Sequence, residues 1–212
     1  MAKAILGIIG GSGVYDLPGL SDRREERVVS PWGEPSDALI RGRLGATELV
    51  FLPRHGRGHR FSPSDIDYRA NIDAVKRAGV TDIVSLSACG SFKEELPPGM
   101  FVLVNQFVDR TVRRESSFFG KGCVAHVSMA LPVGPVLQDR IEAAAKAEGV
   151  AISRGGTYVC IEGPQFSSYA ESTTYKGLGY DVIGMTNMPE ATSTASCPGC
   201  QQSKSVTIAT VA

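Results

Sequence analysis

The chain has 212 residues, of which 42% are hydrophobic and 21% are charged, a composition typical of a globular domain. Its 22 Lys and Arg residues balance its 22 Asp and Glu residues, so the basic excess of a dedicated nucleic-acid-binding protein is missing. No hydrophobic run approaches the roughly 20 residues that span a bilayer, and the N-terminus lacks a signal-peptide pattern. We therefore expect a cytoplasmic protein with no membrane or nucleic-acid partner.

Short runs rich in Val and Ile alternate with helical patterns along the chain. The predicted strands cover residues 4–9, 48–52, 81–86, 100–104, 157–161 and 181–185. The first predicted helix begins at Ser62, which can cap it together with Asp65, and ends at Gly79. A second covers 135–148, and a third begins near Ser168. This alternation indicates an α/β fold: a single domain with a central mixed sheet flanked by helices.

Two charged runs and the end of the chain stand apart from these elements. Residues 22–27 and 110–115 mix both signs of charge, and we interpret them as solvated faces. After residue 190 the sequence is rich in Ser and Thr and has one charged residue, Lys204. We expect a loop over 193–204 and a last strand over 206–211. Residues 1–190 are thus interpreted as the domain and 191–212 as an atypical tail.

The cysteines give no support for a metal or disulfide site. There are five, an odd number that indicates no disulfide framework. Cys197 and Cys200 form a lone Cys-x-x-Cys pair, whereas a structural zinc site usually needs a second pair or two nearby histidines. We expect no metal.

Candidate ligand-binding residues follow several predicted strands. Ser12 lies in a glycine turn, which is either a plain tight turn or an oxyanion-binding one. Arg54 and His55 can present donors to phosphate or can be solvated loop residues. Ser87 and Ala88 are small enough to leave room for a ligand, although packing alone explains them equally well.

Two later strand ends carry an aromatic residue and a methionine. Phe166 can stack on a flat base or pack in the core, Met185 can cover a sugar, and Thr186 can donate to an anion. Each motif alone is weak. Their shared place at strand ends is stronger support for a site, because ligands of open α/β sheets gather there.

In chain order, these motifs resemble those of the S-methyl-5′-thioadenosine phosphorylases, within the trimeric purine nucleoside phosphorylase superfamily. The resemblance runs from about residue 3 to residue 191. The matching segments are 7–13, 35–39, 54–57, 68–72, 87–91, 109–111, 161–164 and 185–190.

The resemblance implies a role for each candidate. The implied phosphate-binding residues are Ser12, Arg54, His55, Ser87, Ala88 and Thr186. Met185 would lie against the ribose and Phe166 near the base, while Ser167 stands where relatives acting on 6-oxopurines carry Glu, which favours a 6-aminopurine. His126 would reach the 5′ group of a neighbouring subunit's substrate in a homotrimer, with a plain surface role as its alternative. Phosphate would be a co-substrate, and no cofactor is implied.

The implied reaction is phosphorolysis of 5′-methylthioadenosine to adenine and 5-methylthioribose 1-phosphate. The family's Asp-x-Asp loop, whose first Asp meets purine N7, has no match after Glu190, so no catalytic residue is assigned. Two alternatives therefore stay open. One is a catalytically silent relative that binds phosphate or nucleoside, or only oligomerises. The other is an enzyme acting on methylthioinosine or another purine nucleoside.

Overall fold

The computed structural model describes residues 4–11, 17–196 and 205–212. Ser12 and the Cys197–Cys200 pair lie outside the described residues. Within them, eleven strands form one mixed sheet, whose main path has the order β2-β3-β4-β1-β5-β10-β9-β7. The strands are β1 Ile5–Gly10, β2 Ser21–Glu26, β3 Leu39–Leu44, β4 Thr47–Pro53, β5 Asp82–Ser91, β6 Phe101–Val104, β7 Gln106–Asp109, β8 Ile152–Arg154, β9 Thr157–Cys160, β10 Val182–Gly184 and β11 Ser205–Val211. The predicted α/β class and mixed sheet are confirmed.

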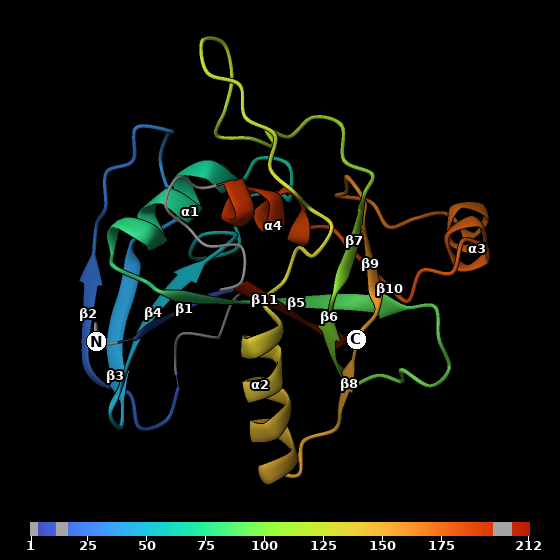
Figure 1. Cartoon of the computed structure of the whole chain (residues 1–212), viewed down its shortest axis with the longest axis horizontal. Helices are drawn as coiled ribbons and strands as arrows, with labels where there is room; N and C mark the ends of the chain where they lie inside the picture. The colour runs from blue at the N-terminus through green and yellow to red at the C-terminus, as the bar shows by residue number, and fades with distance from the viewer. Residues whose placement is uncertain (1–3, 12–16, 197–204) are drawn as a thin grey trace.

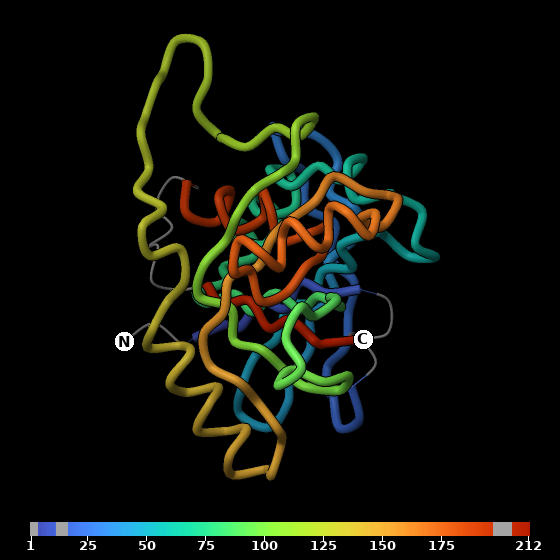
Figure 2. Tube along the Cα trace, turned by 90° about the vertical axis from the view of Figure 1, so that its right-hand side faces the viewer, coloured from blue at the N-terminus to red at the C-terminus, as the bar shows by residue number. Residues whose placement is uncertain are grey.

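Four helices flank this sheet in the described part of the chain: α1 Tyr68–Arg77, α2 Pro135–Ala147, α3 Tyr169–Gly177 and α4 Asn187–Ser196. In Figure 1, α1 and α4 lie side by side above the strands, α2 lies below them, and α3 stands at the far right. Part of the segment 110–134, between β7 and α2, extends away from the body of the molecule in Figures 1 and 2, whereas its Phe118 packs in the hydrophobic core. No helix in the described residues has the length and hydropathy needed to cross a membrane.

Strand β5 links the two halves of the sheet. Its first residues pair with β1 in parallel, from Leu6 opposite Asp82 to Ile9 opposite Ser85. Beyond β1, the strand ends by pairing with β10 in antiparallel, through Gly90 and Ser91, and it also pairs with β11 as far as Cys89. The prediction ended this strand at 86, so Ser87 and Ala88 lie inside β5 rather than after it. Because β1 stops first, both residues still lie beyond its carboxyl end.

Two hydrophobic clusters pack around this framework. One joins β1, β4 and α1 through Ile9, Val50, Ile72 and Val75, which are at most 1% exposed. The other surrounds β6, β9 and β11 and includes Val102, Tyr158 and Ala209. These clusters hold in place the strands whose ends carry the candidate site residues.

Helix α1 begins later than the sequence predicts. Its N-cap is Asp67, whose Oδ1 accepts a hydrogen bond of 2.9 Å from the Ala70 amide. Ser62 does not cap it, because residues 63–65 form a turn in which the Ser62 hydroxyl donates to Asp65 Oδ2 over 2.5 Å. The capping box of α3, formed by Ser168 and Glu171, is confirmed.

The predicted loop over 193–204 is wrong for its first residues. Helix α4 runs to Ser196 across the expected boundary at 190, and its Ser193 and Thr194 are buried. Hydroxyl groups on α4 bond to carbonyls one turn back, for example Thr194 Oγ1 to Glu190 O at 2.9 Å, so small polar residues can occupy a buried helix. The predicted last strand is confirmed as β11.

The capping assignment gives a direct test. Replacing Asp67→Ala removes the acceptor for the Ala70 amide, so we expect the free energy of unfolding to fall by about 1 kcal/mol. Ser62→Ala is the matched control and should change it by less than about 0.5 kcal/mol. Urea unfolding followed by circular dichroism measures both. A larger loss from Ser62→Ala than from Asp67→Ala would contradict the assignment.

Candidate active site

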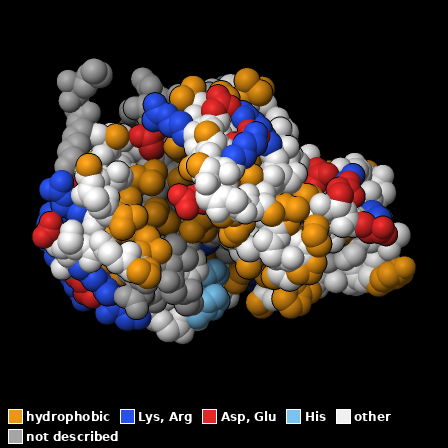
Figure 3. Space-filling view, turned by 90° about the horizontal axis from the view of Figure 1, so that it is seen from below, with side chains coloured by type: hydrophobic (Ala, Val, Ile, Leu, Met, Phe, Trp, Pro, Cys, Tyr) orange, Lys and Arg blue, Asp and Glu red, His pale blue; other side chains and the backbone are white. Residues whose placement is uncertain are grey.

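A cavity of about 520 Å³ opens where β1 and β4 end and β5 continues. Hydrophobic side chains gather on the face seen in Figure 3, with histidine side chains at its edge. The cavity is lined by Gly11, Arg54, His55, His59, Pro63, Leu86, Ser87, Ala88, Cys89, Gly90, Ile161, Phe166, Ser167, Ile183, Gly184, Met185, Thr186 and Ala212. Eight of the ten predicted site residues are among them.

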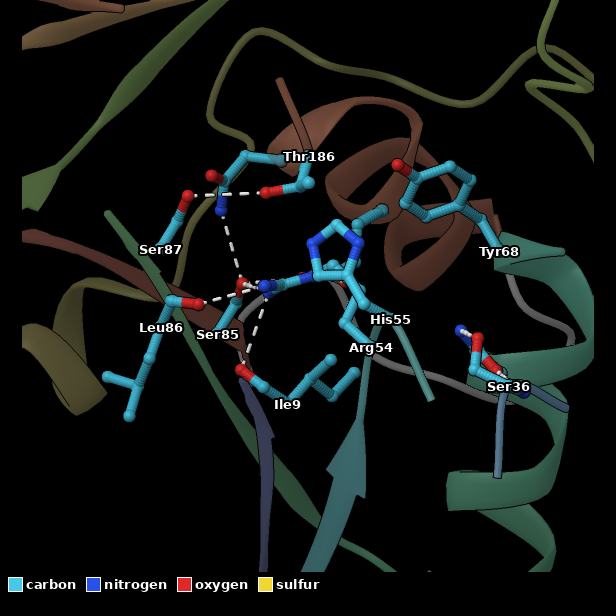
Figure 4. A network of polar contacts seen from close by, with 12 residues as sticks. Ile9, Ser36, Arg54, His55, Tyr68, Ser85, Leu86, Ser87 and Thr186 are labelled. Carbon is cyan, nitrogen blue, oxygen red and sulfur yellow. Dashed lines mark hydrogen bonds and ion pairs between the residues drawn. The ribbon is translucent and has the colours of Figure 1, made fainter. Parts of the chain in front are cut away.

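Arg54 forms the charged floor of this cavity. It follows β4 directly, and its amide donates to Gly10 O over 2.9 Å. Its guanidinium is buried and donates to Glu190 Oε2 at 2.7 Å and Oε1 at 3.0 Å. Further bonds reach Ser85 Oγ at 2.8 Å and Leu86 O at 2.9 Å on β5 and Ile9 O at 3.4 Å on β1, so the side chain is held from three elements (Figure 4).

The pair with Glu190 keeps Arg54 charged. Burial alone lowers the pKa of the Arg54 guanidinium, but the Glu190 carboxylate outweighs it and holds that pKa above its usual value. The guanidinium is therefore permanently charged and fixed in place, with its charge balanced by the Glu190 carboxylate.

His55 lies beside Arg54 with a defined tautomer. Its Nδ1 is 2.9 Å from the carbonyl oxygen of Phe61, and because a carbonyl can only accept, Nδ1 carries the proton. Burial lowers the pKa of His55, and the neighbouring His59 and Arg54 lower it further. The neutral ring thus presents Nε2 as an acceptor, stacked against His59 at a centroid distance of 4.1 Å.

Two buried hydroxyl groups complete the polar side of the cavity. Ser87 Oγ and Thr186 Oγ1 are 3.2 Å apart, and Figure 4 shows them facing each other close to Arg54. Behind them, Tyr158 Oη lies 3.4 Å from Ser87 Oγ. Ala88, next along β5, is exposed to the cavity. Strand β5 and the segment after β10 therefore bring together residues that lie 99 positions apart in sequence.

The opposite side of the cavity is apolar and carries Phe166, Ser167 and Met185. The Phe166 side chain is 88% exposed, so the alternative that it packs in the core is wrong. Ser167 Oγ lies 2.7 Å from Ser172 Oγ on α3. The cavity thus has a polar end and an apolar end, as a ligand with an anionic group and a flat group would need.

One predicted residue lies away from this group. His126 is exposed on the segment 110–134 and does not line the cavity. Its role toward a neighbouring subunit stays a prediction. The described residues contain no group of three or more His, Cys, Asp or Glu side chains able to hold a metal ion.

Sequence reasoning missed two residues that organise the site. Glu190 received no role, although it is the only charged residue between Asp181 and Lys204, a signal that could have marked it. Arg114 belongs to the run interpreted as a solvated face, but its side chain is 1% exposed, so that interpretation is wrong for this residue. It donates to carbonyl groups of the peptide backbone, which leave no trace in a sequence.

Residues 5–200 match the family described as the phosphorylase superfamily. The chain is 73% identical over 191 residues to S-methyl-5′-thioadenosine phosphorylase of Bradyrhizobium diazoefficiens and 59% identical over 189 residues to that of Cereibacter sphaeroides. These matches cover 90% and 89% of this chain but 66% and 65% of the relatives, so the chain spans just under two thirds of their length.

Solved structures agree with this similarity. A methylthioadenosine phosphorylase from an antarctic soil metagenomic library is 44% identical, with a TM-score of 0.90 over 100% of this chain and 73% of its own. An enzyme of Schistosoma mansoni, an adenosine/methylthioadenosine phosphorylase variant in complex with adenine, is 35% identical, with a TM-score of 0.89 over 99% of this chain and 80% of its own. Sequence, fold and cavity agree, and the chain belongs to the phosphorylase superfamily.

Proposed function

We propose that this chain binds phosphate and a purine nucleoside in the cavity and catalyses phosphorolysis of 5′-methylthioadenosine. The products would be adenine and 5-methylthioribose 1-phosphate. The observation that carries the proposal is the convergence of a buried cation, Arg54, with His55, Ser87 and Thr186 at one end of a cavity whose other end is apolar. The similarity to S-methyl-5′-thioadenosine phosphorylases supports the choice of nucleoside.

Phosphate would occupy the polar end. The Arg54 guanidinium, paired with Glu190, lies beside this end. The hydroxyl groups of Ser87 and Thr186 can donate to phosphate oxygens, and these bonds are stronger than neutral ones because the acceptor is charged. Ala88 and His55 border the same space, and the resemblance adds Ser12. Held there, a phosphate oxygen can attack C1′ while the bond from C1′ to the purine nitrogen breaks. Positioning and charge would supply most of the acceleration.

The nucleoside would occupy the apolar end. Met185 would lie against the ribose, and Phe166 would stack near the purine, next to the short hydroxyl of Ser167. The Schistosoma mansoni relatives have been solved with adenine, a 6-aminopurine, and with tubercidin, which supports the preference that Ser167 suggests. Cytoplasmic location and a homotrimer, in which His126 would reach a neighbouring substrate, stay predictions.

A catalytically silent relative is the second candidate. The described residues that line the cavity include no Asp or Glu side chain, so the proposal assigns no proton donor to purine N7. A protein of this kind would bind phosphate and nucleoside without turning them over. The next experiment separates the two candidates.

Adenine release should depend on phosphate. With 5′-methylthioadenosine as substrate, we expect adenine and a sugar phosphate to form in equal amounts only when phosphate is present, because no described group activates water. A coupled absorbance assay for adenine measures this. Ser87→Ala/Thr186→Val should raise the phosphate KM by about tenfold or more, since two bonds to an anion are lost.

The double variant Ser193→Ala/Thr194→Val on α4 makes the same chemical changes outside the cavity and should leave the phosphate KM within about threefold. Equal release in phosphate-free buffer would indicate a hydrolase and would overturn the proposal. Binding of both ligands without turnover would establish the silent relative instead.

The polar end should bind sulfate more tightly as the pH falls. Sulfate keeps its two charges throughout, so any pH dependence belongs to the protein. Because the pKa of His55 is lowered in the free cavity, the ring is neutral near pH 7 and gains a proton, and a donor at Nε2, when an anion binds at lower pH. We expect the Kd for sulfate to fall by about fivefold between roughly pH 8 and 5.5, measured by calorimetry.

His55→Gln should flatten this dependence, whereas His126→Gln, which changes a histidine outside the cavity, should keep it. An unchanged slope in His55→Gln would show that the group responsible lies elsewhere.

A further inference from the structure

The Arg114 side chain is buried in a run of exposed charges. It is 1% exposed, whereas the side chains of its neighbours Arg113 and Glu115 are 64% and 78% exposed. Removing a guanidinium from water is costly unless its donors find partners. The hydrogen-bond partners of Arg114 therefore indicate which parts of the structure its burial stabilises.

The shortest bonds of Arg114 go to backbone carbonyls that follow two strands and to one carbonyl in α4. Arg114 Nη1 donates to Met185 O and to Met188 O, both at 2.6 Å, and Nη2 donates to Glu162 O at 2.7 Å. Met185 follows β10 and Glu162 closely follows β9, its parallel neighbour in the sheet. The last hydrogen bond between these strands runs from the Ile161 amide to Gly184 O at 2.9 Å. Arg114 thus joins the segments that follow β9 and β10, at the point where the hydrogen bonding between these two strands ends.

The Glu162 side chain holds Arg114 in this position. Its Oε1 is 3.5 Å from Arg114 Nε, and its Oε2 accepts from the amides of Val112 at 2.6 Å and Arg113 at 3.3 Å. Partial burial alone would raise the pKa of Glu162, but bonds from Ser64 and these amides, with the charge of Arg114, lower it to about 2. Glu162 therefore stays ionised and fixes the backbone that delivers Arg114.

The two segments joined by Arg114 both line the cavity. Met185 lies on the segment that follows β10, and the chain that leaves Glu162 leads to Phe166 and Ser167. The Met185 side chain lies close to Gly163, so the two segments pack directly on each other. The polar end is organised by Arg54 and Glu190 instead, and the contacts described for Arg114 do not include Arg54, His55 or Ser87.

We propose that Arg114 is a positioning residue for the nucleoside: its guanidinium fixes how the Met185 segment and the segment leading to Phe166 lie relative to each other, and ribose and purine would lie against these two segments. This inference rests on the proposed function. The planar guanidinium suits this role because the directions of its N–H donors are fixed, whereas the lysine ammonium is a point charge on a flexible side chain. Loss of the guanidinium should therefore weaken nucleoside binding while leaving anion binding intact.

The test compares Arg114→Gln and Arg114→Lys with Arg113→Gln as the matched control. Calorimetry measures the Kd of each protein for tubercidin, a nucleoside probe, and for sulfate, with circular dichroism to verify folding. We expect Arg114→Gln to weaken tubercidin binding by about tenfold or more and to leave the Kd for sulfate within about threefold. Arg114→Lys should fall between this variant and the parent. Arg113→Gln should match the parent for both ligands.

Each outcome either supports or overturns the role proposed for Arg114. If Arg114→Gln does not fold, Arg114→Lys replaces it, and weaker tubercidin binding with unchanged sulfate binding supports the inference. Equal weakening of both ligands, or of neither, overturns the inference alone. A parent that binds sulfate but no nucleoside contradicts the proposed function, and the inference with it.

Discussion

The buried ion pair of Arg54 and Glu190 is the interaction on which the candidate site depends. Their side chains are 2% and 4% exposed, and neither charge could stay in this interior without the other. The pair joins the end of β4 to α4 across the sheet, and Ser85 on β5 bonds to both partners. Because every contact is directional, the pair fixes where β4, β5 and α4 meet, and therefore where His55, Ser87 and Thr186 lie.

Arg114 is a second buried cation, and it organises a different part of the cavity. Arg54 organises the polar end of the cavity, whereas Arg114 joins the ends of β9 and β10 at the apolar end. The start of α4 lies between them, since Met188 O accepts from Arg114 and the Glu190 carboxylate accepts from Arg54. The site is thus built from segments far apart in sequence that two guanidinium groups hold together, which explains its dependence on α4 although that helix consists largely of small polar residues.

Features that depend on neighbouring residues in the sequence could be predicted, whereas features that depend on contacts made only in the folded chain could not. The strands around the site and the pair Arg54–His55 were predicted, because strand ends and clustered donors are local patterns. Asp67 was missed as the cap of α1 because Ser62 offers an equally good local motif, and only packing decides between them. Helix α4 was missed because its buried face carries Ser and Thr, whose hydroxyl groups bond to carbonyls of the same helix. In the sequence these residues look like those of an exposed loop. Arg114 could not be found, since its shortest bonds are to backbone carbonyls, and its side-chain partners, Ser64, Tyr68 and Glu162, lie at least 46 positions away in the sequence.

A double-mutant cycle on Arg54 and Glu190 tests most directly whether this pair is the organising interaction. Urea unfolding of Arg54→Met, Glu190→Met and the double variant gives the coupling free energy. We expect each single variant to lose about 3–5 kcal/mol, because it leaves one buried charge alone, and the double variant to lose less than the sum by at least about 2 kcal/mol. Losses that simply add would show that the two side chains stabilise the fold independently and would contradict the account.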